Sequence, residues 1–418
     1  MRVVEGRAFF QGRFEECCIG IDGGKIVDIK KILKGDEHHK FGNNYILPAG
    51  IDIHVHFREP GQTYKEDFRS GTESAACGGV SCVFDMPNNV PPIVDVRTYK
   101  EKLSEIRGKA NVDYGVYVAL NEESRSDELV ELGCPFKVYM AEGEKGLGFL
   151  DYEKLGVVFE DLGNERHIGV HCEDKNLVSE GGRDLDELLK MRPNEAEASA
   201  IRRVMQIAGK RNIHICHVSA GESIPLIESP HLTSEATPHH LLLSKDDDLD
   251  AFGKTRPPLR TKSDRIALWE ALVSGKIDVI ASDHAPHTMD EKEESFENAP
   301  SGVPGVETSL PLMLAHVKKG ILTIDRLVST MMERPAEMMG LEKGRIEVGM
   351  DADLIAVDMR NITKIRGMDL HSKCGWTPFE RWEGIFPIAT FVRGELVAKD
   401  RELQEKHKGR LIIQNEKP

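Results

Sequence analysis

The sequence lacks long hydrophobic runs, an excess of basic residues and paired-cysteine motifs. No stretch approaches the roughly 18 to 20 apolar residues of a membrane span, and residues 1–20 lack the charged-then-apolar order of a secretory signal. We therefore expect a cytoplasmic protein with no membrane partner. The formal net charge of -15 argues against a nucleic-acid partner, so an anionic substrate would need local basic groups.

The eight cysteines form no CxxC pair, and several fall within apolar, strand-like runs such as residues 80–86. We expect them to be reduced and mostly buried. A chain of 418 residues that is 40% hydrophobic can bury a large core, which favours one big domain with a smaller one beside it.

Short apolar runs alternate with helix-length polar segments over most of the chain. Eight runs have the composition of buried strands: residues 50–56, 79–87, 112–120, 136–140, 167–171, 213–218, 232–237 and 277–282. Helices are expected between them, for example at residues 94–108, 195–208 and 263–274. This alternation predicts an α/β fold, either a (β/α)8 barrel or a doubly wound sheet. Eight strands, with reactive residue types at their C-terminal ends, favour the barrel.

Both ends of the chain have a different pattern. Residues 2–10, 18–21 and 25–31 read as short strands, and residues 349–358 and 387–396 are strand-like again. We therefore expect two domains. Residues 48–344 would form the barrel, and residues 1–47 plus 345–418 would form a small composite β domain.

The first chemical signal is the pair His54 and His56, which follows Asp52 in the first expected barrel strand. Residues two apart on a strand point to the same side, so both imidazoles can bind one metal ion. Taken alone the pair is weak evidence, because a chain with 16 histidines often contains one by chance. A structural pair of histidines is then about as good an explanation.

Three further residues strengthen that signal, because His171, His217 and Asp283 each lie at the end of an expected strand. In a barrel these strand ends meet at one rim. Imidazole and carboxylate groups suit zinc, and zinc lowers the pKa of a bound water enough to give a hydroxide nucleophile near neutral pH.

Four motifs are shared with a known family. They are DIHVHFREPG at residues 52–61, MPNN at 86–89, HICHVS at 214–219 and SDHAPH at 282–287. In these motifs the chain resembles the dihydroorotases of the amidohydrolase superfamily, and the resemblance extends to the segment 349–358 and the terminal β domain. The HxH and SDHAPH motifs occur across the superfamily, whereas HFREPG together with MPNN is more specific to dihydroorotases.

The resemblance implies two zinc ions per chain. His54 and His56 would hold one, His171 and His217 the other, and a carboxylated Lys137 would bridge them. Asp283 would bind the first zinc and act as general acid and base. Some bacterial dihydroorotases carry aspartate as the bridge, and this chain departs from them at Lys137. A mononuclear or differently bridged site is the alternative.

The resemblance also implies a carboxylate-binding group made of Arg58, Asn88 and His287. An acidic protein needs a specific counter-charge for its substrate, and a guanidinium can bind a carboxylate at two points. The simpler alternatives are a turn-forming asparagine beside Pro87 and a histidine that only supports other site residues. Residues 255–260 and 300–306 resemble the loops that cover the substrate in this family.

The expected activity is the reversible zinc-dependent cyclisation of N-carbamoyl-L-aspartate to (S)-dihydroorotate and water, the third step of de novo pyrimidine (UMP) biosynthesis. A metal-bridging hydroxide would attack the ring amide in the reverse direction. Two alternatives are an allantoinase or dihydropyrimidinase-type cyclic amidase, and a non-catalytic dihydroorotase-like scaffold for aspartate transcarbamoylase. Arg58 and Asn88 argue against the first, and the complete ligand set argues against the second. We expect a monomer or homodimer, with association with aspartate transcarbamoylase left open.

Overall fold

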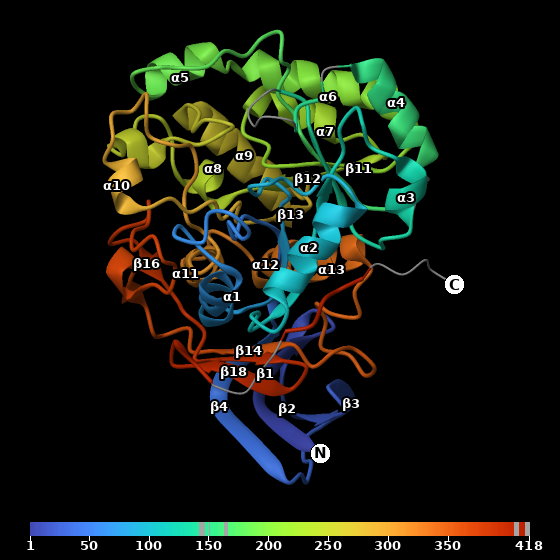
Figure 1. Cartoon of the computed structure of the whole chain (residues 1–418). Helices are drawn as coiled ribbons and strands as arrows, with labels where there is room; N and C mark the ends of the chain where they lie inside the picture. The colour runs from blue at the N-terminus through green and yellow to red at the C-terminus, as the bar shows by residue number, and fades with distance from the viewer. Residues whose placement is uncertain (142–146, 150, 163–165, 405–408, 414–418) are drawn as a thin grey trace.

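The computed structural model describes residues 1–141, 147–149, 151–162, 166–404 and 409–413. Figure 1 shows a large region wrapped by helices and, below it, a sheet that carries the N-terminus. Among the described residues, no helix is long and apolar enough to cross a membrane.

The helix-wrapped region is a barrel of parallel strands, and all eight expected runs are confirmed as strands. They are β5 (Gly50–Val55), β6 (Val80–Asp85), β7 (Asp113–Val116), β8 (Val118–Ala119), β9 (Phe136–Tyr139), β10 (Ile168–His171), β11 (Ile213–Ile215), β12 (Leu232–Ala236) and β13 (Val279–Ile280). The third run is divided into β7 and β8 at Tyr117, whose ring is buried inside the barrel with Phe84. The strands form two arcs, β5-β6-β7 and β8 to β13.

The barrel closes where β5 meets the segment that follows β13. The amide of His56 donates to the carbonyl of His284 at 2.8 Å. The amide of Ser282 donates to the carboxylate of Asp52 at 3.1 Å. Because these contacts join the first and last strands, they bring the HxH motif beside Asp283.

Helices cover the outside of the barrel. They are α1 (Phe68–Cys77), α2 (Val96–Ile106), α3 (Ser126–Val130), α4 (Tyr152–Asp161), α5 (Leu185–Met191), α6 (Asn194–Ala208), α7 (Ile224–Ile227), α8 (Pro238–Leu242), α9 (Lys262–Ser274), α10 (Met289–Lys292), α11 (Ser309–Lys318), α12 (Ile324–Val328) and α13 (Arg334–Met339). Local sequence sets their ends. In α9, Thr261 and Asp264 form a capping box, and Gly275 ends the helix with a φ of 90°. The three helices expected from the sequence correspond to α2, α6 and α9.

The second sheet brings the two ends of the chain together. Its strand order is β19-β18-β17-β14-β4-β1-β2-β3. The strands are β1 (Arg2–Phe10), β2 (Arg13–Asp22), β3 (Lys25–Lys30), β4 (Glu37–Pro48), β14 (Leu354–Val357), β17 (Ala389–Val392), β18 (Glu395–Lys399) and β19 (Glu402–Leu403). The pairing of β14 with β4 joins the C-terminal strands to the N-terminal ones. The residue limits of the two domains remain a proposal.

Part of the C-terminal region packs on the barrel and not on this sheet. Strands β15 (Thr363–Lys364) and β16 (Glu383–Gly384) form a separate pair. Between them, the indole N–H of Trp376 donates to the carbonyl of His287 at 2.8 Å. Lys373 forms an ion pair with Asp67 at 2.5 Å. The C-terminal region therefore reaches the barrel end at which the sequence places the reactive residues. All eight cysteines are free and buried, as expected.

A buried ionic cluster joins the sheet to the base of the barrel. The ammonium of Lys343 lies 2.9 Å from Asp113 at the start of β7, 2.6 Å from Asp353 and 3.0 Å from Asp351. Arg393 forms a second ion pair with Asp113. Burial would lower the pKa of Lys343, but Asp353 and Asp113 outweigh it and raise the pKa. Lys343 contacts all three of these carboxylates, so removing it would take away a counter-charge from each.

We predict that Lys343→Met strongly destabilises the protein, because it leaves buried carboxylates without their counter-ion. Removing one partner of such a group costs about 3–5 kcal/mol. Urea unfolding followed by circular dichroism would measure the loss. Lys25→Met is the control, because Lys25 also pairs with Asp351 but its side chain is 37% exposed. Equal, small losses in both variants would contradict the prediction.

Candidate metal centre and substrate pocket

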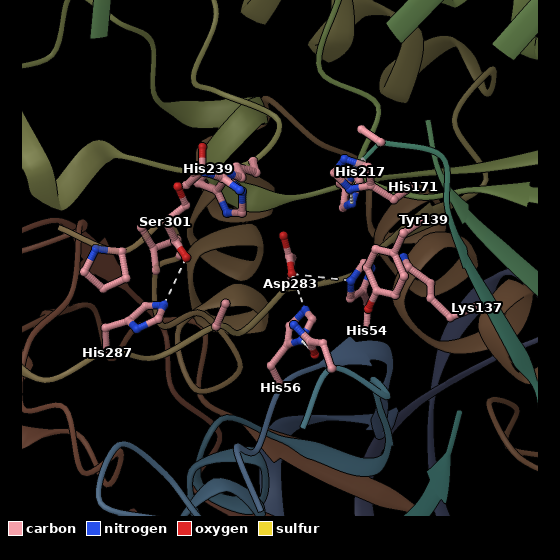
Figure 2. A pocket seen from close by; sticks show the side chains of 18 of the residues that line it. His54, His56, Lys137, Tyr139, His171, His217, His239, Asp283, His287 and Ser301 are labelled. Carbon is pink, nitrogen blue, oxygen red and sulfur yellow. Dashed lines mark hydrogen bonds and ion pairs between the residues drawn. The ribbon is translucent and has the colours of Figure 1, made fainter. Parts of the chain in front are cut away.

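A cavity of about 320 Å³ opens at the C-terminal ends of the barrel strands. Its lining includes every site residue expected from the sequence: His54, His56, Arg58, Asn88, Lys137, His171, His217, Asp283 and His287. These side chains come from strands far apart in sequence and converge on one space (Figure 2). The barrel therefore brings the expected residues together.

The carboxylate of Asp283 lies against the imidazoles of His54 and His56. One of its oxygens is 3.0 Å from Nε2 of His56 and 3.4 Å from Nε2 of His54, as Figure 2 shows with dashed lines. The three ligand atoms lie within 4.8 Å of one another. Burial would raise the pKa of Asp283, but the two histidines outweigh it and hold the pKa below its usual value. Asp283 is therefore an anion at neutral pH.

Each of these histidines is fixed by a hydrogen bond from its other ring nitrogen. Nδ1 of His54 donates to the buried carboxylate of Glu235, and Nδ1 of His56 donates to Oδ1 of Asn88 at 2.5 Å. With Nδ1 engaged in these bonds, the Nε2 of each ring is the atom that would bind a metal ion beside Asp283. Such orienting bonds are the usual support of metal-binding histidines.

A second pair of histidines lies across the cavity. Nδ1 of His171 is 3.0 Å from Nε2 of His217, and Nε2 of His171 donates to Glu173 at 2.8 Å. Nδ1 of His217 is buried and finds no hydrogen-bond partner among the residues that the structure describes. Burial and the neighbouring His171 lower the pKa of His217 well below its usual value, so its imidazole is neutral. Two rings that point their nitrogens at each other are suited to hold a cation.

Lys137 lies at the end of β9 beside both histidine pairs and is almost fully buried. Its amino group forms no ion pair with a carboxylate in the part of the chain that the structure describes. Its nearest polar contact is Sγ of Cys216, at 2.8 Å. A buried amino group without a carboxylate partner among the described residues has the surroundings that carboxylation by carbon dioxide requires.

The donor set fits a metal ion. It combines neutral imidazole nitrogens with a carboxylate in a buried pocket, which is the chemistry that zinc and similar divalent metals prefer. Three of the residues also have strained backbones. Arg58, His217 and Asp283 have φ values of 59°, 36° and 47°, in the left-handed region that costs a non-glycine residue about 1–3 kcal/mol. Strain of this kind gathers at functional sites, because the surrounding fold must impose it.

The wall opposite the metal ligands carries a group suited to an anion. The guanidinium of Arg58 lies 3.1 Å from Nε2 of His287 and is only 6% exposed. Lys65 donates to Nδ1 of His287 at 3.0 Å, so Nε2 carries the proton and donates to the carbonyl of Ser301 at 2.9 Å. Burial and then Arg58 lower the pKa of His287 well below its usual value, so Arg58 and Lys65 supply the positive charge.

The sequence assigned no definite role to several residues that line the pocket, among them Arg192, Arg256, His239 and Ser301. Arg192 forms an ion pair with Glu173 and so supports His171 through that carboxylate. Little in the sequence indicates this contact, because Arg192 lies between α5 and α6 and not at the end of a strand. Arg256 and Ser301 lie in the two loops expected to cover the substrate. Burial lowers the pKa of His239 to about 4, so it adds a neutral donor or acceptor.

Two comparisons by sequence connect the chain with known proteins. The Amidohydrolase family profile matches residues 45–143 and 198–397. A protein named dihydroorotase from Methanosarcina acetivorans is 39% identical over 97% of this chain and 93% of its own length. The protein of the same name from Halobacterium salinarum is 40% identical over 95% of this chain and 96% of its own length.

The comparison by structure gives hydantoinases. The L-hydantoinase (dihydropyrimidinase) of Arthrobacter aurescens has a TM-score of 0.93 and 28% identity, with 99% of each chain covered. A dihydropyrimidinase from Brevibacillus agri has a TM-score of 0.89 and 25% identity, with 98% of each chain covered. These enzymes support the barrel with a separate β-sheet domain.

We predict that divalent metal stabilises the chelator-treated protein and that the two histidine pairs contribute separately. His54→Asn and His171→Asn should each bind about half or less of the zinc taken up by the wild type, because each removes one nitrogen ligand. Elemental analysis after dialysis and thermal unfolding with added Zn²⁺ would measure this. His38→Asn is the control, because His38 is exposed on β4. Wild-type metal content in both site variants would rule out this centre.

Proposed function

The chain belongs to the amidohydrolase family, and on that premise we propose that it is a dihydroorotase. It is a cyclic-amide hydrolase that interconverts (S)-dihydroorotate and N-carbamoyl-L-aspartate. The family and the full-length relatives named dihydroorotase support this activity. One observation carries the choice of substrate: the buried guanidinium of Arg58 lies in the same pocket as the metal ligands, where it can neutralise the carboxylate that dihydroorotate carries.

The metal content that we propose is two zinc ions per chain. His54 and His56 would hold one, His171 and His217 the other, with a carboxylated Lys137 between them. This assignment is supported by the buried amino group of Lys137, which lies 2.8 Å from Sγ of Cys216 and has no carboxylate partner among the described residues. It is also supported by the ring nitrogens of His171 and His217, which face each other at 3.0 Å. When bound, the metals supply Lewis acidity at the ring carbonyl and lower the pKa of the attacking water.

The protein's own groups then orient the ring and move protons. Arg58, Asn88 and His287 bind the ring carboxylate, which places the opposite amide near Asp283. In hydrolysis, water adds to the amide carbon while the Asp283 carboxylate takes a proton from it. The same proton passes to the ring nitrogen as the C–N bond breaks, and the new carboxylic acid then gives its own proton to Asp283. Cyclisation is the reverse path and begins with protonated Asp283.

A cyclic amidase that acts on uncharged rings is the second candidate, because the solved structures compared above are hydantoinases and dihydropyrimidinases. Their rings lack the carboxylate of dihydroorotate, which is the group that the guanidinium of Arg58 is suited to bind at two points. Full-length relatives named dihydroorotase favour the first candidate. We further propose a cytoplasmic monomer or homodimer, with aspartate transcarbamoylase as a partner to be tested.

The direct test of this function compares substrates on the zinc-loaded wild type. Absorbance assays with dihydroorotate, allantoin, dihydrouracil and hydantoin would give kcat/KM for each. We expect dihydroorotate to be preferred by at least about 100-fold, because one charge-assisted contact contributes about 1.5–3 kcal/mol and two or more are formed. Equal or better turnover of an uncharged ring would assign the metal site to the second candidate.

We predict that Arg58→Ala raises KM for dihydroorotate by about 10- to 100-fold, because it removes the charge-assisted bonds to the substrate carboxylate. Arg58→Lys should recover part of that loss, since it restores the charge without the two-point fork. Dihydrouracil turnover is the internal control and should change little. A KM for dihydroorotate that stays within twofold of the wild type would remove Arg58 from the substrate site.

The low pKa of Asp283 predicts opposite pH dependences for the two directions. Hydrolysis uses the carboxylate, which is fully formed above that pKa. Cyclisation uses the protonated acid, whose fraction falls about tenfold for each pH unit above the pKa. Initial cyclisation rates should therefore fall from about pH 6 to about pH 9. A cyclisation rate that rises over this interval would contradict the role of Asp283, as would an Asp283→Asn variant that retains its metal and both activities.

A further inference from the structure

One wall of the pocket is a segment of irregular backbone after α10. Residues 300–303 of this segment line the cavity. Gly302 has a φ of 137°, and a Cβ there would lie 2.5 Å from the carbonyl oxygen of Ala285 and 3.1 Å from Nε2 of His287. The wall is therefore seated tightly against the strand end that carries Asp283 and His287. Such close packing of an irregular segment needs partners for its carbonyl groups.

Two buried lysines supply those partners. The ammonium of Lys292, at the end of α10, donates to the carbonyls of Pro300 at 2.9 Å and Gly302 at 3.2 Å. The ammonium of Lys254 donates to the carbonyls of Phe296 at 2.6 Å and Ala299 at 2.8 Å. The backbone adds to this, because the amide of Gly302 donates to the carbonyl of Lys254 at 2.9 Å.

Both lysines place a basic group where a positive charge is costly. Their side chains are 1% and 5% exposed, and within the described part of the chain neither forms an ion pair with a carboxylate. Aromatic rings supply part of the compensation: Lys292 lies 5.6 Å from the ring centre of Trp376 and Lys254 lies 5.1 Å from that of Phe296. Burial and then Lys254 lower the pKa of Lys292 to about 7. A hydrophobic residue would avoid the cost of burying a basic group, but it could not donate hydrogen bonds to the carbonyls. The two lysines are therefore expected to have a use in these hydrogen bonds.

That use follows from what the two lysines connect. Lys254 immediately precedes Thr255 and Arg256, which line another part of the same cavity. The carbonyl of Ser301, between two carbonyls held by Lys292, accepts the hydrogen bond of His287. Trp376, which packs on Lys292, donates to the backbone carbonyl of His287. The lysines therefore link both covering loops to the group that would read the substrate carboxylate.

We propose that Lys254 and Lys292 are positioning residues that fix the wall 296–303 against His287 and so set the affinity of the pocket for its anionic ring substrate. This role rests on the proposed function. Neither ammonium touches the substrate. Their donors hold the carbonyls of the wall in the arrangement in which Ser301 orients His287 beside Arg58.

The test is Lys292→Met in the zinc-loaded full-length enzyme, with Lys343→Met as the matched control. Both variants remove a lysine that is 1–3% exposed, but Lys343 lies in the ionic cluster at the base of the barrel. We expect Lys292→Met to raise KM for dihydroorotate by about tenfold or more while kcat and metal content change by less than about threefold. Lys343→Met should lower the melting temperature and leave KM unchanged.

Two results would overturn the proposal. One is a KM for Lys292→Met within twofold of the wild type. The other is a rise in KM that Lys343→Met reproduces at equal loss of stability, which would mean that destabilisation alone changes the pocket. Failure of the proposed function is distinguishable, because the wild type would then not turn over dihydroorotate at all.

Hydrogen exchange on the wild type provides a second measurement that does not depend on how the variant folds. The amides of residues 296–303 should exchange slowly in the substrate-free enzyme, because the lysines hold the wall before substrate binds. Dihydroorotate should then add little protection. Fast exchange in the free enzyme, with strong protection only after dihydroorotate is added, would show a wall ordered by substrate and would contradict the proposal.

Discussion

The site depends on one contact, the closure of the barrel between β5 and the segment after β13. Two hydrogen bonds make this closure, from the amide of His56 to the carbonyl of His284 and from the amide of Ser282 to the side-chain carboxylate of Asp52. They place Asp283 against the HxH pair, although the residues are more than 200 positions apart in the sequence. If these strands did not meet, the carboxylate would have no imidazole to face and the metal centre would not form. A parallel barrel makes such a meeting at the C-terminal rim a property of its topology.

Charge is handled in the same way throughout the pocket. Each metal-facing histidine but one is oriented by a buried polar partner, Glu235, Asn88 or Glu173. Glu173 is in turn neutralised by Arg192, which together with His171 outweighs burial and lowers its pKa to about 2. These hydrogen bonds fix the orientation of the rings, so that a second ring nitrogen of each faces the cavity. Arg58 remains as a positive group of the pocket. Beside it lies His287, which is oriented by Ser301 of the wall that Lys254 and Lys292 hold.

Much of this could be predicted from the sequence. The eight strand runs were identifiable because strands buried on both faces read as continuous apolar segments, and the reactive residues stood at their ends. The family resemblance supplied the pairing of ligands, which spacing alone could not give. The structure shows what local pattern could not: that Tyr117 interrupts the third run, that Trp376 returns from the C-terminal region to the pocket, and that Arg192 supports His171. Each of these depends on contacts between distant segments, and no periodicity encodes them.

The most direct test of the account is a crystal structure of the zinc-loaded enzyme with dihydroorotate, phased to show anomalous density at the zinc edge. The account predicts one peak among His54, His56 and Asp283, a second beside His171 and His217, and carboxylated Lys137 between them. The ring carboxylate should lie on Arg58 and His287. Zinc bound elsewhere, or a ring whose carboxylate points away from Arg58 toward solvent, would contradict the central claim that barrel closure assembles one metal centre and one carboxylate-reading pocket.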